Sequence, residues 1–523
     1  MDEKIIAENK RLVEEYPFLM PRNRFTDEIP DDYDYTYTEL DDMPDGWRKA
    51  FGEQMCAEIK EALGPDIYDY RVIQIKEKYG CYDDQTEVLT EDGWKFFKDI
   101  TFNDKFATLG NDDETLIYQS PIDIINESYE GKMYHLENRG ISLVVTPNHN
   151  LYVAKGSYYN HKNNQKRLYP FELCNPNKYF GKDKRFKKGC KWIGEKRYDI
   201  NSQFIIPEYH RIDEKPFYRE YIYPGFTCNI KDFLKFLGFY IAEGCVYYHK
   251  NKEKQITQIG EITVSYNPYD EEELVTSLIK NIGFEPKQGG KCVKRFSYCA
   301  FAHWLYDNCG HLAQNKQVPT FIKTLSPELI KIFLEYLFIG DGHKTTTSNV
   351  LTTTSKQLCD DVCELLLKAG YAFKYTVRIR HKNSNSIIQS KLPVYEINWL
   401  KLTEIEIDNS KTKKSQSFIE NYEQYNGNVY CVTIPNHILY IRRNGKGVWC
   451  GNSLRWYDRN SDEKVYKIID KYSRLSEHTC VSCGAPATKI SLGWICPWCD
   501  ECASKMRGKF VPLNPDKDIL DNI

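Results

Sequence analysis

Four cysteines near the C-terminus have the spacing of a metal site. Cys480 and Cys483 form one Cys-x2-Cys pair, Cys499 and Cys502 form another, and fifteen residues separate the pairs. Each short pair places two thiolates on one side of an ion, and two pairs complete the tetrahedral set that zinc takes. Reduced structural cysteines and two disulfides are the alternatives. We expect Zn²⁺, with Cys496 either outside the ligand set or competing for its fourth place.

A second pattern, an apolar stretch that ends in a carboxylate and a glycine, occurs twice. Residues 233–244 read FLKFLGFYIAEG and residues 334–342 read LEYLFIGDG. The carboxylates are Glu243 and Asp341. Each stretch is followed by a predicted strand, a helix and a basic strand, so the chain contains an internal duplication of two αββ-type halves.

Three further passages carry residue types that can break a backbone bond. They begin at CYDDQTEVLT (residue 81), LVVTPNHNLYV (143) and VYCVTIPNHILYI (429), and the third continues to WCGNS (449–453). Together they resemble the motifs of the intein and hedgehog autoprocessing (Hint) family. The resemblance implies an all-β splicing domain that excises itself and joins its flanks, without any cofactor.

The resemblance also assigns roles at the first junction. Cys81 would attack the Gly80 carbonyl and convert the amide into a thioester. Intramolecular placement supplies the effective concentration for this step. His149 would protonate the leaving nitrogen, and Thr146 would help to bind the scissile bond or its developing oxyanion.

At the second junction, Asn452 would cyclise onto its own carbonyl and Ser453 would accept the acyl group, with His437 polarising the Asn452 step. Two positions depart from the family pattern. Gly451 stands where His is common, and Cys431 stands where an acidic residue is common. Gly451 therefore keeps open a Hint domain that cleaves itself without ligation.

The duplicated halves resemble the LAGLIDADG homing endonucleases, which are often nested in inteins. The resemblance implies that two motif helices pack through small residues and bring Glu243 and Asp341 together. Two carboxylates so placed can hold Mg²⁺ ions, which would activate water and stabilise the leaving oxygen at each DNA strand. Lys316 matches the lysine near the cleavage centre of this family, and Tyr336 occupies a position that usually holds a small residue.

Double-stranded DNA carrying the uninterrupted host coding site is the expected partner, and positive charge should mark the contact surface. Residues 161–198 hold twelve Lys and Arg against three Asp and Glu, interleaved with aromatic residues. A solvated charged insertion is the alternative. The strands 294–298 and 374–381 should supply base readers, with Arg295, Arg378 and Arg380 as candidates.

The two ends of the chain read as one domain cut in two. A predicted strand at 70–76 stops at Gly80 without a partner, and a second alternating strand begins at Ser453, so the two would form a hairpin once joined. The joined ends resemble small zinc-knuckle proteins of phages, which implies no activity.

The chain has 71 Lys and Arg against 74 Asp and Glu, a formal charge of -3, so any polyanion site must be local. Its N-terminus lacks a signal-peptide pattern, and we expect a soluble, cytoplasmic monomer without membrane contact. A third function class, a DNA-binding zinc protein that never processes itself, stays open. We predict five segments: an N-terminal extein (1–80), the two parts of the splicing domain (81–220 and 396–452), a duplicated α+β endonuclease with αββαββα order (221–395) and a zinc-binding C-terminal extein (453–523).

Overall fold

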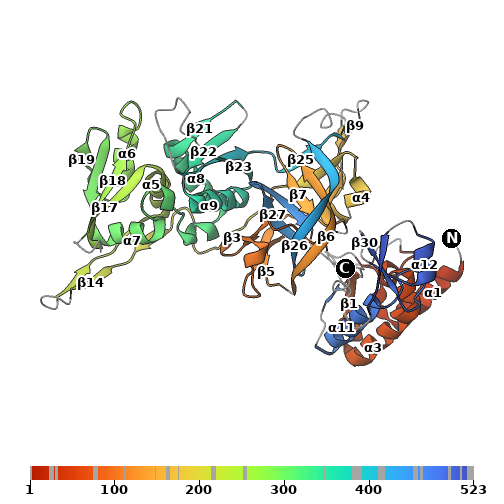
Figure 1. Cartoon of the computed structure of the whole chain (residues 1–523). Coiled ribbons are helices and arrows are strands. Elements are labelled where there is room, and N and C mark those ends of the chain that lie inside the picture. Colours follow the sequence, from red (N-terminus) through yellow and green to blue (C-terminus); the bar gives the residue numbers. More distant parts are fainter. Residues whose placement is uncertain are drawn as a thin grey trace.

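The computed structural model is an elongated, multidomain chain of mixed helices and strands (Figure 1). The structure describes residues 3–22, 29, 33–74, 80–110, 112, 114–121, 123–147, 149–160, 165–174, 176–213, 219–250, 256–346, 348–379, 392–409, 418–451, 457–459, 463–492, 496–506 and 509–514. Among these residues, no helix combines the length and apolarity that crossing a lipid bilayer requires.

The two ends of the chain fold together into one unit, where red and dark blue elements lie side by side in Figure 1. Strand β1 (Arg71–Gln74) pairs antiparallel with β29 (Tyr457–Arg459). One core takes buried side chains from both ends, including Phe51, Ile59 and Tyr472. The helices of this unit are α1 (Glu3–Glu15), α2 (Asp45–Trp47), α3 (Glu53–Leu63), α11 (Glu463–Glu477) and α12 (Asp500–Ser504).

A small three-stranded sheet completes this unit. Its order is β31 (Pro497–Trp498), β30 (Lys489–Leu492) and β32 (Lys509–Pro512). The indole of Trp47 donates to the Thr479 carbonyl over 2.8 Å, and the Gly46 amide donates to the Val481 carbonyl over 3.0 Å. The first flank is therefore hydrogen-bonded directly to the loop that begins the first cysteine pair.

The centre of the molecule is built from strands. A long ribbon pairs β6 (Asp123–Glu137) with β26 (Ile419–Thr433) along the full length of both, and β7 (Ser142–Val145) extends it. A four-stranded sheet has the order β11 (Glu172–Cys174), β8 (Leu151–Lys155), β12 (Lys184–Lys187) and β25 (Glu404–Ile407). A ten-stranded sheet includes β2 (Glu87–Thr90), β3 (Gly93–Phe96), β4 (Phe106–Leu109), β5 (Leu116–Gln119), β27 (Ile438–Arg443) and β28 (Lys446–Gly451).

The part coloured from yellow-green to teal in Figure 1 contains two copies of one order of elements, with an additional helix at the end of the first copy, and confirms the predicted duplication. The first copy contains α5 (Ile230–Glu243), β17 (Gly244–Lys250), β18 (Ile256–Ser265), α6 (Glu272–Asn281), β19 (Lys287–Gly290), β20 (Val293–Ser297) and α7 (Cys299–Cys309). The second contains α8 (Pro327–Asp341), β21 (Gly342–Lys344), β22 (Asn349–Thr353), α9 (Lys356–Lys368), β23 (Ala372–Arg378) and β24 (Val394–Leu400).

The repeated part and the central strands are connected through one β-sheet. Strands β21 to β24 belong to the same ten-stranded sheet as β27 and β28, because Lys374 of β23 pairs with Lys446 of β28. Strand β24 also runs across the predicted boundary between residues 395 and 396. The last strand of the second copy therefore ends later than predicted, and the two regions share one sheet.

Candidate functional sites

The first candidate centre lies where Cys81 meets the loop after β7. The Cys81 amide donates to Thr146 Oγ1 over 2.8 Å, and the Thr146 amide donates back to the Cys81 carbonyl over 2.9 Å. The His149 amide donates to the Thr146 carbonyl over 3.0 Å. A Cβ added to Gly80 would lie 2.4 Å from His149 Cα. The loop therefore holds both residues of the Gly80–Cys81 peptide bond.

Burial controls the chemistry of this centre. Cys81 is 2% exposed, and burial raises the pKa of its thiol well above 9, with smaller contributions in the same direction from Cys431 and Glu127. A thiol of this kind stays neutral near pH 7, so it needs a proton acceptor before it can act as a nucleophile. Histidine is the side chain that titrates in this range, and His149 is fully buried beside this centre.

The second junction approaches the first through β28. The Cys450 sulfur lies 3.5 Å from His149 Nε2, and the Tyr82 hydroxyl donates to the Gly451 carbonyl. Ile438, the first residue of β27, pairs with Gly451. His437, the residue before it, is buried and adopts a positive φ of 56°. The structure thus brings His149 and His437 to the strand that leads into the second junction.

Asn452, Ser453 and Arg380 lie outside the described residues, so their predicted positions have no structural counterpart here. The predicted strand pairing between the flanks is seen from Arg71 to Gln74 and from Tyr457 to Arg459, and residues 75–79 and 452–456 lie outside the description.

The second candidate centre lies between α5 and α8, which pack closely through glycine. A Cβ on Gly238 would lie 2.4 Å from the Phe333 carbonyl oxygen, and one on Gly340 would lie 2.4 Å from Ala242 Cβ. Only glycine permits this distance between helix backbones. Both helices end at their carboxylates, Glu243 and Asp341, so the crossing brings the carboxylates towards each other.

The electrostatics of these carboxylates favour a bound cation. Burial, followed by the charge of Glu243, raises the pKa of Asp341 to about 7, and burial also raises the pKa of Glu243. A hard divalent ion stabilises two such anions by supplying the opposing charge. The residues therefore fit the predicted metal.

Lys316 lies beside this centre. Its ammonium donates to the Gly244 carbonyl over 2.8 Å and stands 4.5 Å from the ring centre of Tyr240. Burial lowers the pKa of Lys316, while Cys309, Cys245 and the two carboxylates act in the opposite direction. The Lys316 ammonium is thus held at Gly244, the first residue of β17. Gly244 follows Glu243 directly in the sequence.

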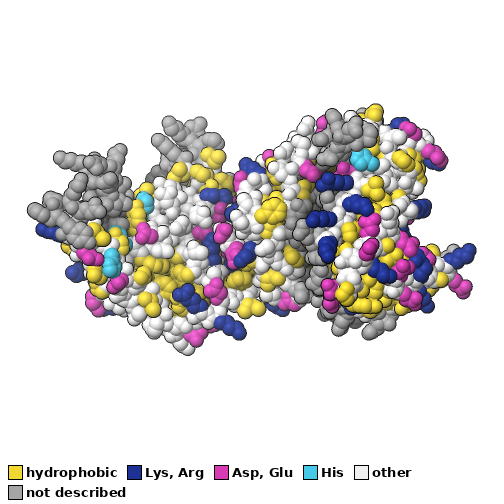
Figure 2. Space-filling view, turned by 90° about the horizontal axis from the view of Figure 1, so that it is seen from below, with side chains coloured by type: hydrophobic (Ala, Val, Ile, Leu, Met, Phe, Trp, Pro, Cys, Tyr) yellow, Lys and Arg dark blue, Asp and Glu magenta, His cyan; other side chains and the backbone are white. Residues whose placement is uncertain are grey.

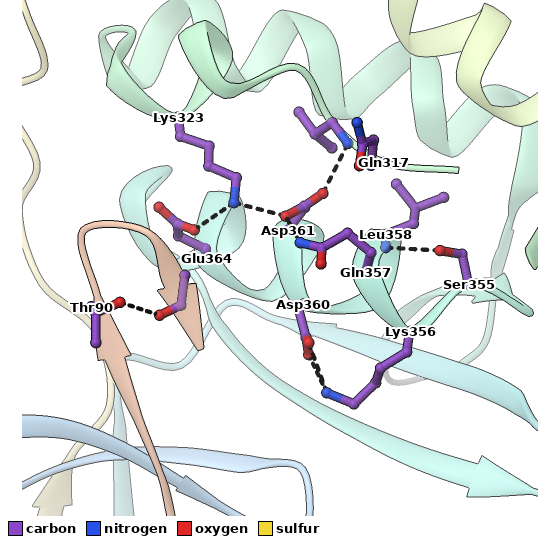
Figure 3. Close-up of polar contacts among 12 residues, drawn as sticks. Thr90, Gln317, Lys323, Ser355, Lys356, Gln357, Leu358, Asp360, Asp361 and Glu364 are labelled. Atoms are coloured by element: carbon purple, nitrogen blue, oxygen red, sulfur yellow. Dashed lines mark hydrogen bonds and ion pairs between the residues drawn. The ribbon is translucent and has the colours of Figure 1, made fainter. Parts of the chain in front are cut away.

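Helix α9 fixes the segment that carries Lys316. The Ser355 hydroxyl donates to the Lys316 carbonyl over 2.6 Å, and the Val318 amide donates to Asp361 over 2.8 Å. Asp361 also binds Lys323 at 2.7 Å, and Glu364 binds the same ammonium at 3.1 Å, as Figure 3 shows. This buried network was not anticipated, because its members are dispersed between the two motifs and only the fold assembles them.

The predicted basic surface needs correction. In residues 161–198, Lys184, Arg185 and Lys188 are almost fully buried. Lys184 and Arg185 pair with Glu420 and Glu404, and Lys188 donates to the Gly140 carbonyl. These three side chains are therefore not exposed for DNA contact: glutamates neutralise Lys184 and Arg185 inside the protein, and Lys188 is buried against a carbonyl. Figure 2 likewise shows basic side chains interspersed with acidic ones over the face it presents.

Two predicted base readers are exposed. Arg295 of β20 and Arg378 of β23 lie on strands of the two copies and make ion pairs with Glu261 and Glu396. Arg295 also lines a notch of about 620 Å³ together with Arg211, Tyr223, Tyr247 and His303. The notch adds a basic and aromatic surface beside β20 that sequence patterns did not reveal.

The four predicted zinc ligands converge. The sulfur atoms of Cys480, Cys483, Cys499 and Cys502 all lie within 4.8 Å of one another. The Cys483 and Cys499 sulfurs are 3.6 Å apart, which matches the edge of a tetrahedron with zinc–sulfur bonds of about 2.3 Å. Cys496 lies outside this group, and its amide donates to Ser491. The residues fit a metal site with four thiolate ligands.

Among the comparisons with known proteins, a family model matches the second copy of the repeated part. Residues 328–408 match the family model of a LAGLIDADG-like domain, so the chain carries such a domain from α8 to β25. Solved structures that resemble the chain include mesophilic variants of the homing endonuclease I-DmoI, at 15% identity and a TM-score of 0.25, covering 32% of this chain and 88% of that one. I-DmoI in complex with DNA and Mn gives 16% identity, a TM-score of 0.24 and coverages of 33% and 90%.

Proteins with sequences similar to this chain are named as enzymes that catalyse unrelated reactions. A DNA-directed RNA polymerase subunit beta C-terminal section of Stigeoclonium helveticum is 24% identical over 419 residues, or 72% of this chain and 37% of the relative. An ATP-dependent Clp protease proteolytic subunit of Chlamydomonas moewusii is 24% identical over 481 residues, or 71% and 45%. A DNA polymerase of Thermococcus litoralis is 34% identical over 162 residues, or 28% and 9%. The chain spans less than half the length of these relatives.

Proposed function

We propose that this chain is a self-splicing precursor: residues 81–452 excise themselves, and the flanks become joined. The observation that carries the proposal is that Thr146 and His149 lie against the Gly80–Cys81 bond. The strand residues Cys450 and Gly451, just before Asn452, lie beside the same loop. The single folded unit made by the two ends also supports it, because ligation would turn that unit into one continuous chain.

The names of the relatives support an inserted element as well. An RNA polymerase subunit and a Clp protease subunit have no common reaction, yet each matches more than two thirds of this chain. The matched share, 71% to 72%, is close in size to residues 81–452 of the 523. A mobile segment carried by different hosts accounts for this pattern.

The first step is an acyl shift within the chain. The Cys81 sulfur attacks the Gly80 carbonyl carbon, the carbon–nitrogen bond breaks, and the thiol proton ends on the Cys81 nitrogen, which becomes a free amine. His149 delivers this proton to the nitrogen. Thr146 Oγ1 holds the same nitrogen and so fixes the amide for attack.

The later steps complete the exchange. The Ser453 hydroxyl attacks the thioester and releases the Cys81 thiol, so the first flank becomes an ester on Ser453. The Asn452 carboxamide nitrogen then attacks the Asn452 carbonyl, forms a cyclic imide and frees the Ser453 amine. That amine attacks the ester to leave a peptide bond, and the serine hydroxyl is restored.

Variants at each junction test this order of steps. Cys81→Ala should block the thioester while release at Asn452 continues, and Asn452→Ala should retain the intein on the second flank. Cys245→Ala, which removes an exposed thiol of the repeated part, is the matched control and should splice normally. Ligation that persists in either junction variant refutes the assigned roles.

We propose that the repeated part is a homing endonuclease that cuts double-stranded DNA at the uninterrupted host site. Glu243 and Asp341 would hold Mg²⁺, which activates water and stabilises the leaving oxygen. Lys316 places a positive charge beside them. The exposed arginines of β20 and β23 would contact the DNA.

Asp341→Asn tests this second activity. We expect cutting of DNA that carries the joined host sequence to fall by at least about 100-fold while splicing continues, because the two centres use different residues. Glu335→Gln, which changes an exposed carboxylate on the same helix, is the control and should cut normally. Normal cutting by Asp341→Asn excludes this carboxylate from the centre.

A domain that cleaves without ligation is the second candidate, and Gly451 favours it because the usual histidine is missing. It would release the flanks as separate pieces, whereas a non-processing zinc protein would stay intact. Mass spectrometry of the expressed chain distinguishes these outcomes.

A further inference from the structure

Tyr82 connects the two junctions through one side chain. It follows Cys81 directly in the sequence, and its hydroxyl donates to the carbonyl of Gly451, 369 positions away. Gly451 in turn directly precedes Asn452. A hydrogen bond therefore joins the residue after the first cleavage point to the residue before the second.

The position of Tyr82 is tightly determined. Its amide donates to the Tyr430 carbonyl over 2.8 Å, and the Tyr430 amide donates back over 2.9 Å. Its ring stacks on Phe97 at 4.8 Å between centroids and meets the edge of His149 at 4.4 Å. Tyr82 is fully buried, so its hydroxyl must have a partner, and the Gly451 carbonyl is that partner.

Cys450 extends this connection to His149. Its sulfur is 3.5 Å from His149 Nε2. Burial raises the pKa of the Cys450 thiol, and the Tyr82 side chain is close enough to oppose this effect in part. The polar groups thus form a chain from His149 through Cys450 and Tyr82 to the Gly451 carbonyl. Every member is described and buried.

Position 451 cannot supply a polarising side chain itself. A Cβ on Gly451 would lie 2.3 Å from the Asn150 carbonyl oxygen and 2.8 Å from Leu173 Cδ2. A histidine there would require the backbone to move. The orientation of the peptide before Asn452 must therefore come from another residue.

We propose that Tyr82 and Cys450 are positioning residues for splicing: Tyr82 orients the peptide that precedes Asn452, and Cys450 orients the His149 ring. The inference rests on the proposed splicing function. Asparagine cyclisation is an intramolecular attack whose rate depends on how the backbone is held, so one fixed peptide plane raises the effective concentration of the carboxamide. Tyr82 would take over part of the role that the histidine common at this position has in the Hint family pattern.

Tyr82→Phe, which keeps the ring and removes the hydroxyl, tests the first half. In a Cys81→Ala background, we expect release at Asn452 to slow by about 10-fold, since the buried Gly451 carbonyl loses its donor. In an Asn452→Ala background, thiol-induced cleavage at Cys81 should change by less than about 3-fold. Tyr425→Phe is the matched control, because Tyr425 also donates to a backbone carbonyl, that of Asn428, on an exposed part of β26.

Three outcomes of this test are distinguishable. Slower release at Asn452 alone supports the inference. Equal slowing at both junctions means that Tyr82 only supports the fold, and unchanged release means that its hydroxyl is not used, so either result overturns it. If the unmodified chain neither splices nor cleaves, the proposed function fails before Tyr82 is tested.

Cys450 is tested through the pH dependence of cleavage at Cys81. Cys450→Ala removes the sulfur beside His149 and should change the slope of the pH profile between about pH 6 and 9, whereas Cys450→Ser keeps a hydrogen-bonding group and should restore the original slope. A purely structural role would lower the rate by the same factor at all pH values and leave the slope unchanged, and that result overturns the assignment.

Discussion

Reactivity at Cys81 depends on how one buried thiol loses its proton. Burial disfavours the thiolate, and neither Cys431 nor Glu127 offsets this effect. Cys431 occupies the position where the family usually has an acid, and it too is fully buried. The first step should therefore be limited by deprotonation of Cys81.

The pH dependence of cleavage at Cys81 follows from this environment. Because the thiol pKa lies well above 9, the thiolate fraction rises about tenfold per pH unit throughout the range from 6 to 9. We expect thiol-induced cleavage in Asn452→Ala to increase across this range without a plateau. A plateau near pH 7 would mean that the folded protein holds Cys81 as a thiolate.

At this scale the sequence identified residues that lie in recognisable motifs. Cys81, Thr146, His149 and Lys316 were predicted from local patterns, and the structure places the first three together. Tyr82 and Cys450 could not be assigned, because their contacts arise when β28 comes to lie beside a segment hundreds of residues earlier. Spacing along the chain does not encode such a contact.

Among the elements, the pair α5 and α8 depends most on residue size. The helices approach so closely that Gly238 faces the backbone of α8. The sequence suggested that Tyr336 would disturb this packing. Tyr336 is only half-buried, and the centre of its ring lies 5.9 Å from the Lys235 ammonium. Its ring lies at the side of the contact, so the crossing is preserved.

Gly238→Ala should separate these helices. Alanine favours helix formation, but its Cβ would lie 2.4 Å from the Phe333 carbonyl oxygen, so we expect destabilisation of the repeated part by about 1–3 kcal/mol and loss of DNA cutting. Gly260→Ala is the control, since no atom lies within 4 Å of its Cβ. Denaturant unfolding measures both, and equal stability of the two variants would contradict the close packing.

The order of elements was predictable because the periodicity of each helix and strand is local, whereas the shared sheet was not. Lys374 and Lys446 carry like charges, and nothing in their local sequence indicates that they pair. Only the fold shows that the predicted endonuclease and splicing regions continue one sheet.

Across the whole molecule, buried ion pairs connect these two regions. Arg442 of β27 is 0% exposed and binds Glu87 at 2.7 Å and Asp360 of α9 at 2.8 Å. Its guanidinium also stands 4.0 Å from the ring centre of Trp94. The repeated part is therefore anchored to the central strands by a desolvated charge.

Removing that charge should destabilise both regions together. In the trapped Cys81→Ala/Asn452→Ala chain, we expect Arg442→Ala to cost about 3–5 kcal/mol, because Glu87 and Asp360 lose their shared cation. Lys356→Ala, at the half-exposed rim of the same cluster, should cost less than about 1 kcal/mol. If the two regions unfold in separate transitions and Arg442→Ala lowers the midpoint of only one of them, the proposed coupling between the regions is contradicted.

The joined flanks should depend on zinc. Removing the metal with a chelator is expected to lower the melting temperature of the ligated flanks, and Cys483→Ser should do the same. Cys496→Ser is the matched control because Cys496 lies outside the thiol cluster. Equal losses from both substitutions would indicate that the cysteines act only through packing.

The sequence predicted that the two ends belong together because one predicted strand stops at Gly80 without a partner and another begins at Ser453. It could not show that Lys184 and Arg185 of the basic segment are neutralised by Glu420 and Glu404, more than 200 positions away. Net charge in a window cannot reveal partners at that distance.

The most direct test of self-splicing is the intact mass of the freshly expressed chain under reducing conditions. Splicing predicts two products, residues 81–452 as one free polypeptide and residues 1–80 joined to 453–523 as another, and neither should form in the Cys81→Ala/Asn452→Ala chain. A single species of the full 523 residues that persists in the unmodified protein would contradict the account.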